Sequence, residues 1–183
     1  MKMNFSKSFQ RGFTLIELLI VIAVLGTLAV VVLIALNPVQ QLARTRDAGR
    51  SSSVQQLGRS MEARGTVLGG IYPLLAACPV DTWITDCLVA AGEIQTVPGN
   101  LPASYSAGGV TNSCADAQGF CYSVDLTGNE FTIYTSAEAQ SNTAQCAAVD
   151  QTWFVYASAA GRGGLYCGAA PTVTAFNLTN FTQ

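Results

Sequence analysis

The sequence contains no histidine, and only 11% of its 183 residues are charged. Without histidine, the chain cannot form a Ser-His-Asp triad, a Cys-His pair or a histidine-bound metal site. With a net charge of −2, the chain is not basic, whereas nucleic-acid-binding proteins typically are. Bases are scarce in the C-terminal part, where only Arg162 follows Arg64, against eight acids between Asp81 and Asp150. We therefore expect no enzyme, cofactor or metal site.

No Cys-x-x-Cys pair, the usual spacing of zinc and redox sites, is present. An even number of cysteines after a membrane segment predicts disulfides in an oxidising compartment, with buried free thiols in a cytosolic domain as the alternative. Six cysteines allow fifteen pairings, and we expect pairing in sequence order because each consecutive pair flanks a short loop. The six are Cys78, Cys87, Cys114, Cys121, Cys146 and Cys167.

Charge is also missing from Phe13–Leu36 except at Glu17, which leaves a run of 24 mostly apolar residues. As a helix this run is about 36 Å long at ~1.5 Å per residue, enough to cross the ~30 Å core of a bilayer. A secretory signal has an apolar core of roughly 7–15 residues with a small-residue cleavage site after it. Here the small residue, Gly12, comes first, and a buried core helix is rarely so long. The run therefore predicts a membrane anchor.

The orientation of this anchor does not follow from charge alone. Three bases precede the run and three follow it closely, so the positive-inside rule is nearly a tie. The cysteines all follow the run, which favours an N-terminal arm in the cytoplasm and a C-terminal part on the oxidising side. The six bases are Lys2, Lys7, Arg11, Arg44, Arg46 and Arg50.

Glu17 is the one acid in the run, and an ionised carboxylate in hydrocarbon costs ~3 kcal/mol or more. The stretch around it, "RGFTLIELLIVIAVLG", closely resembles the prepilin leader and N-terminal helix of type IV pilins and type II secretion pseudopilins. The resemblance implies that a membrane aspartyl peptidase cuts between Gly12 and Phe13 and methylates the new N-terminus at Phe13. It also implies that Glu17 helps each subunit to enter a growing fibre.

Electrostatics supports that role for Glu17 independently. Cleavage creates an ammonium group at Phe13, and methylation keeps its positive charge. In a staggered bundle of parallel helices, Glu17 of one subunit neutralises this amine on the next, in a low dielectric where ion pairing is strong. The positive end of the helix dipole adds to this. The alternative is that Glu17 lies near the membrane surface and reaches water.

A polar helix is expected to follow the anchor. Its stripe of Val54, Leu57, Met61 and Leu68 recurs at helical spacing, and Gly69-Gly70 closes the helix. We expect the helix breaks at Gly26, the one weak position in the middle of the anchor, and at Pro38, where a backbone hydrogen bond is lost and the helix kinks. Five arginines between Arg44 and Arg64 are interpreted as a solvated face, or as partners of acids on a neighbouring head.

The residues after Ile71 are small, polar and strand-forming. A hairpin is predicted over Phe120–Ser136, with further strands at 152–158 and 164–168 and a tail that adds an edge strand. Trp153 and Val155 then lie on one face of the third strand, and Phe154 and Tyr156 on the other. Because both faces are apolar, we expect the stem to cover one and a loop or a neighbouring subunit the other.

Together these patterns predict an α+β fold similar to type IV pilins, with a long N-terminal helix on a small antiparallel sheet of about four strands. The expected segments are a leader at 1–12, a membrane and assembly helix at 13–36, an amphipathic stem at 37–68 and a disulfide-stabilised head at 69–183.

The resemblance implies a structural subunit of a type IV pilus or related filament. The implied partners are further copies of the chain in a helical filament, the prepilin peptidase, the pilus assembly platform and the membrane. Nucleic acid is expected as a partner only through a DNA-uptake role. The monomer is expected in the cytoplasmic membrane with its head outside the cytoplasm, and the filament at the cell surface or in the periplasm. The alternatives are a pseudopilin or minor pilin of a secretion or DNA-uptake system, and a single-span envelope adhesin that forms no fibre.

Overall fold

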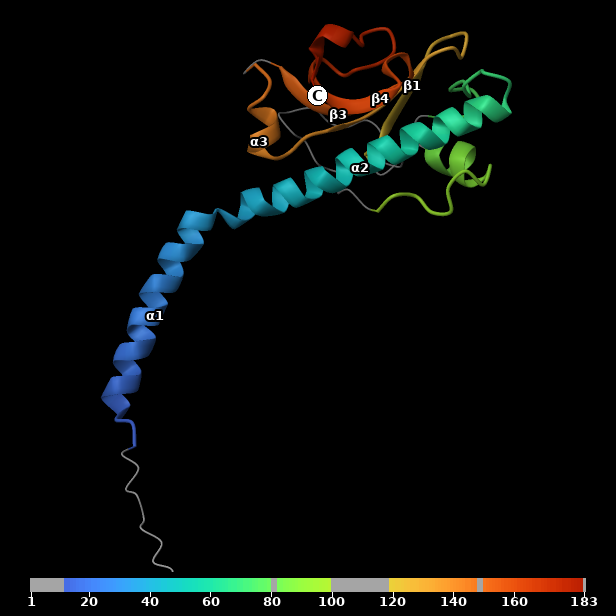
Figure 1. Ribbon diagram of the computed structural model, residues 1–183. Coiled ribbons are helices and arrows are strands. Elements are labelled where there is room, and N and C mark those ends of the chain that lie inside the picture. Colours follow the sequence, from blue (N-terminus) through green and yellow to red (C-terminus); the bar gives the residue numbers. More distant parts are fainter. Residues whose placement is uncertain (1–11, 80–81, 100–118, 148–149, 183) are drawn as a thin grey trace, which may run out of the picture. The chain divides into compact units, whose positions relative to one another are not determined.

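A computed structural model describes residues 12–79, 82–99, 119–147 and 150–182 (Figure 1). The chain divides into two compact units, one ending at Gln41 and the other running from Leu42 to Gln183. The architecture is α+β and consistent with a type IV pilin-like fold, as the sequence predicts. The helices are α1 (Leu15–Leu36), α2 (Pro38–Val67), η1 (Ile84–Val89), α3 (Gln140–Thr143), η3 (Ser158–Ala160) and η4 (Leu178–Asn180), and the strands are β1 (Cys121–Val124), β2 (Phe131–Ser136), β3 (Gln151–Ala157), β4 (Arg162–Gly168) and β5 (Phe181–Thr182).

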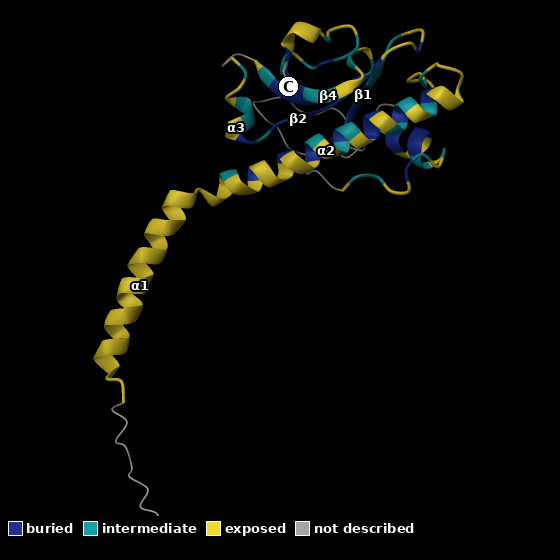
Figure 2. Cartoon of the chain, in the orientation of Figure 1, coloured by how far each residue is buried: buried dark blue, intermediate teal, exposed yellow. Residues whose placement is uncertain are grey.

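The first unit contains α1, whose 22 residues are all exposed (Figure 2). Its length and hydropathy are sufficient to cross a membrane. The helix runs unbroken through Gly26, so the expected weakness there does not interrupt it. An apolar helix that buries none of its own side chains needs lipid or other protein around it.

The break near Pro38 is a complete end of one helix and the start of the next, not the expected kink. Asn37 adopts a left-handed conformation with φ of 42°, which asparagine tolerates better than most residues. Pro38 is then the first residue of α2, where its missing N–H leaves no helical hydrogen bond unmade. The two residues therefore end α1 and start α2 without a loop between them.

The buried face of α2 is the stripe that the sequence predicts, with one exception. Val54, Leu57 and Met61 are each at most 1% exposed and form a core with β2, β3 and η1. Leu68 is 42% exposed, because α2 ends at Val67 and the chain turns away through Gly69 and Gly70, both with positive φ. The expectation that Leu68 continues the stripe was wrong.

The sheet is antiparallel with strand order β1-β2-β3-β4-β5. Its first two strands form the predicted hairpin, and the tail adds β5 at the edge beside β4, also as expected. In the described part of the loop-rich segment before the hairpin, residues 84–89 form the π-helix η1, which the sequence does not predict.

Each face of the sheet has its own core. Phe154 and Tyr156 point to the core shared with α2. Trp153 and Val155 point to the opposite face, where Phe176 and Phe181 of the C-terminal segment pack with them. The second face is therefore covered by this chain's own tail. Of the two predicted alternatives, a loop or a neighbouring subunit, the structure shows a segment of the same chain.

A buried ion cluster joins α2 to the segment between β2 and α3. Asp47 and Arg50 are 1% and 2% exposed, and their side chains form an ion pair at 3.0 Å. The Asp47 carboxylate also accepts hydrogen bonds from the backbone N–H groups of Glu138 and Ala139 and from the Asn142 amide, at 2.7–3.0 Å. It thus pairs the two backbone N–H groups that immediately precede α3 and one side chain of that helix.

Glu138 brings two of the five arginines into this cluster. Its carboxylate accepts a hydrogen bond from Arg46 Nε at 2.8 Å and lies 3.3 Å from Arg50 Nη1. The Arg46 hydrogen bond, aided by both positive charges, holds the pKa of Glu138 below its usual range. The interpretation of these arginines as a solvated face was therefore wrong for Arg50, and the acid that Arg46 and Arg50 bind belongs to their own chain.

Two glycines of α2 allow aromatic rings to approach the helix closely. A Cβ on Gly58 would overlap the base of the Tyr156 ring, and one on Gly65 would lie 2.6 Å from Tyr72 Cε1. Both glycines are buried, seven residues apart and on the face that carries Leu57 and Met61. They set the distance between α2 and its aromatic neighbours.

This contact predicts opposite effects for two substitutions in the same helix. We expect Gly58→Ala to destabilise the head by about 1–3 kcal/mol, because the ring and the helix must move apart. Gly49→Ala, whose new Cβ meets nothing within 4 Å, should instead stabilise it by up to about 1 kcal/mol. Urea unfolding of the full chain in detergent measures both, since the chain's two tryptophans, Trp83 and Trp153, are buried in the head. Equal stability of the two variants would contradict this.

Candidate processing and assembly site

The predicted cleavage site lies in an open segment before the first helix. Gly12 and Phe13 are outside any helix or strand, and Phe13 is 85% exposed. A Cβ on Gly12 would meet nothing within 4 Å. The peptide bond between these two residues is therefore not enclosed by the described part of the chain.

Thr14 and Glu17 form a capping box at the start of α1. The Thr14 hydroxyl accepts a hydrogen bond from Glu17 N–H at 3.3 Å and donates one to Glu17 Oε2 at 2.7 Å. The Glu17 carboxylate in turn accepts from Thr14 N–H at 2.9 Å. Two N–H groups that the helix leaves unpaired are satisfied in this way.

The capping box changes the electrostatic account of Glu17. The carboxylate is turned toward the N-terminal end of its own helix, where two donors of Thr14 and the helix dipole stabilise negative charge. Sequence reasoning missed Thr14, although the Thr-Leu-Ile-Glu spacing is a capping-box signature. Glu17 is thus in contact with Thr14, the residue next to Phe13, within a single chain.

The cysteines form bridges in the head. Cys78 pairs with Cys87 and Cys146 with Cys167, with Cα–Cα distances of 5.9 and 5.4 Å, and these are neighbours in sequence order. Cys121 is also disulfide-bonded, whereas Cys114 lies outside the described residues.

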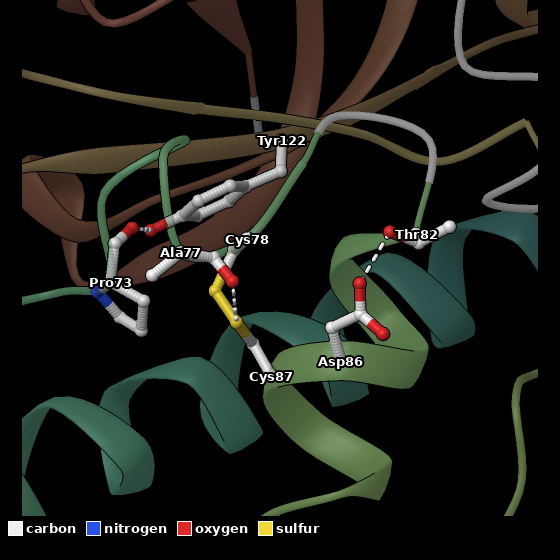
Figure 3. Close-up of a disulfide and its surroundings, with 7 residues drawn as sticks. All are labelled: Pro73, Ala77, Cys78, Thr82, Asp86, Cys87 and Tyr122. Carbon is white, nitrogen blue, oxygen red and sulfur yellow. Dashed lines mark hydrogen bonds between the residues drawn. A yellow bond between two sulfur atoms is a disulfide. The ribbon is translucent and has the colours of Figure 1, made fainter.

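The first bridge ties the segment after α2 to η1 (Figure 3). Beside it, the Tyr122 hydroxyl donates to the Pro73 carbonyl at 2.8 Å, and the Thr82 hydroxyl to Asp86. Trp83 Nε1 donates to the Phe120 carbonyl at 2.9 Å. The bridge and these bonds fix a segment with little regular structure against β1.

A comparison with protein-family models finds one match, the prokaryotic N-terminal methylation motif, at residues 7–33. This interval contains the cleavage site, the capping box and most of α1. No curated protein and no solved structure matches the chain. The motif is structural and pilin-type, and with the apolar α1 it indicates membrane anchoring and, in general, processing by prepilin peptidase and filament assembly. At its N-terminus, therefore, this chain carries the signal of a type IV prepilin-like protein.

Proposed function

We propose that this chain is a structural subunit of a type IV pilus or a related filament. Prepilin peptidase cuts it between Gly12 and Phe13 and methylates Phe13, and the mature subunits polymerise through α1. Glu17 pairs with the Phe13 amine of a neighbouring subunit during assembly. The observation that carries the proposal is the methylation motif at residues 7–33, placed on an apolar helix that buries none of its side chains.

The disulfide-bonded head supports a location outside the cytoplasm, since disulfides persist in oxidising compartments. We place the monomer in the cytoplasmic membrane with α1 across the bilayer and the head on the outer side. The assembly platform receives it there, and the filament extends to the periplasm or the cell surface. In the filament, neighbouring copies of α1 replace lipid around the exposed apolar side chains.

Mass spectrometry of the protein from its native membrane tests the processing step. The expected mass is that of a chain that starts at Phe13 and carries one added methyl group. Gly12→Leu is the matched variant, because it removes the small residue before the cut and should leave the leader attached. A wild-type chain that keeps its leader, or is cut elsewhere, would contradict the proposal.

A further inference from the structure

Three apolar side chains are exposed at the last residue of α2, in the segment that follows it and in the turn between β1 and β2. Val67, Ile71 and Leu126 are 70%, 51% and 97% exposed. Leu126 belongs to this group because the turn between β1 and β2 lies against the segment after α2 (Figure 1), where Tyr72 N–H donates to the Gly128 carbonyl at 2.7 Å. We name these three residues, with Asp125 and Glu130 of the same turn, the tip patch.

A second group is exposed at the start of the same helix. Leu42 is 60% exposed, and Arg44 is exposed beside it. We name these two residues the base patch. Exposed apolar residues at both ends of one helix, with its middle packed into the core, leave two separate surfaces for contact.

The two patches carry opposite charge. In the tip patch, the Asp125 carboxylate is held by its own turn, accepting from Glu130 N–H at 3.0 Å and from Thr127. The Glu130 carboxylate makes none of the hydrogen bonds or ion pairs found among the described residues, and it is exposed. Arg64, half-buried in the last turn of α2, carries one positive charge against the two negative charges of Asp125 and Glu130, so this end is net negative.

The base patch carries the positive charge of an arginine that is not neutralised by an ion pair among the described residues. Arg46, about two turns into α2, forms an ion pair with Glu138, whereas Arg44 forms none of the ion pairs of the described residues. An exposed arginine beside Leu42 therefore complements an exposed glutamate near Leu126.

We infer that the tip patch of one copy of this chain binds the base patch of a second copy. This rests on the proposed function, since it assigns a contact within the proposed filament. Leu126 and Ile71 of one head pack against Leu42 of the next, and Glu130 faces Arg44. The apolar side chains provide most of the contact and the charges orient it, because a single exposed ion pair contributes little.

A second copy fits the tip patch better than other occupants. Tip against tip would place the Glu130 carboxylates together, and an anionic membrane surface would repel the same acids. A tip-to-base contact is heterologous, so each added copy leaves one tip and one base free. Such contacts build an open filament instead of a closed dimer.

Charge reversal and an apolar-to-charged change test the contact in the full chain, in cells that assemble it. The measured quantity is the amount of protein in sheared filaments relative to processed protein in the membrane. We expect Leu126→Asp to lower this ratio many-fold, and Arg44→Glu and Glu130→Arg to lower it several-fold each. The double variant Arg44→Glu with Glu130→Arg should recover most of the wild-type ratio.

Leu178→Asp is the matched control, since Leu178 is 57% exposed in the tail and belongs to neither patch. It should assemble like the wild type. A wild-type ratio for Leu126→Asp, or a double reversal that assembles worse than either single reversal, would overturn the inference. Failure of the proposed function is distinguishable, because it appears as an uncleaved wild-type N-terminus instead of a changed ratio.

Discussion

Replacing Asp47 with alanine is expected to destabilise the head by about 3–5 kcal/mol, the usual range for removing one partner of a buried ion pair. The variant leaves Arg50, which is 2% exposed, without its nearest acid. It also leaves the N–H groups of Glu138 and Ala139 without the carboxylate that accepts from them. Urea unfolding of the disulfide-intact chain in detergent, followed by tryptophan fluorescence, measures the loss.

Asp86→Ala is the control, because it removes an exposed aspartate whose carboxylate accepts a hydrogen bond from its near neighbour in sequence, Thr82. It should change stability by about 0.5 kcal/mol or less. A second comparison tests the pairing itself: Arg50→Met in the Asp47→Ala background should cost less than the sum of the two single changes. Similar losses for Asp47→Ala and Asp86→Ala would show that the buried cluster contributes no special stability.

The elements of this fold are readable from local patterns. The apolar run to Leu36 and the glycines at 69 and 70 mark the ends of the two long helices. Alternating apolar residues in the third strand predict its two faces, and both are buried as expected. These features depend on residues close together in the sequence, where helical and strand periods leave a clear signal.

The features that the sequence does not predict depend on distant partners. Arg50 lies in a run of arginines that is typical of a solvated face, and one of the two acids that pair with it in the core, Glu138, comes 88 residues later. Glycine has a low helix propensity, yet at position 58 it allows the Tyr156 ring to pack directly against α2. Thr14 is an exception, because its capping box with Glu17 depends only on residues three apart and is recognisable in the local sequence.

The capping box gives Glu17 two separable roles. One is to accept hydrogen bonds from Thr14 at the start of α1. The other, in the proposed filament, is to pair with the Phe13 amine of a neighbour. Alanine at position 17 removes both roles, so it cannot tell them apart. Glutamine can still complete a capping box but carries no charge.

We therefore expect Glu17→Gln to be cut and inserted like the wild type but to assemble poorly. The yield of sheared filaments should fall roughly tenfold or more, because ~1.4 kcal/mol of lost ion pairing already changes an association constant tenfold. Thr14→Val is the complementary variant: it removes the capping hydroxyl, keeps the carboxylate and should retain most of the assembly. If Glu17→Gln assembles normally while Thr14→Val does not, the carboxylate acts by capping its own helix, and the charge pairing between subunits is wrong.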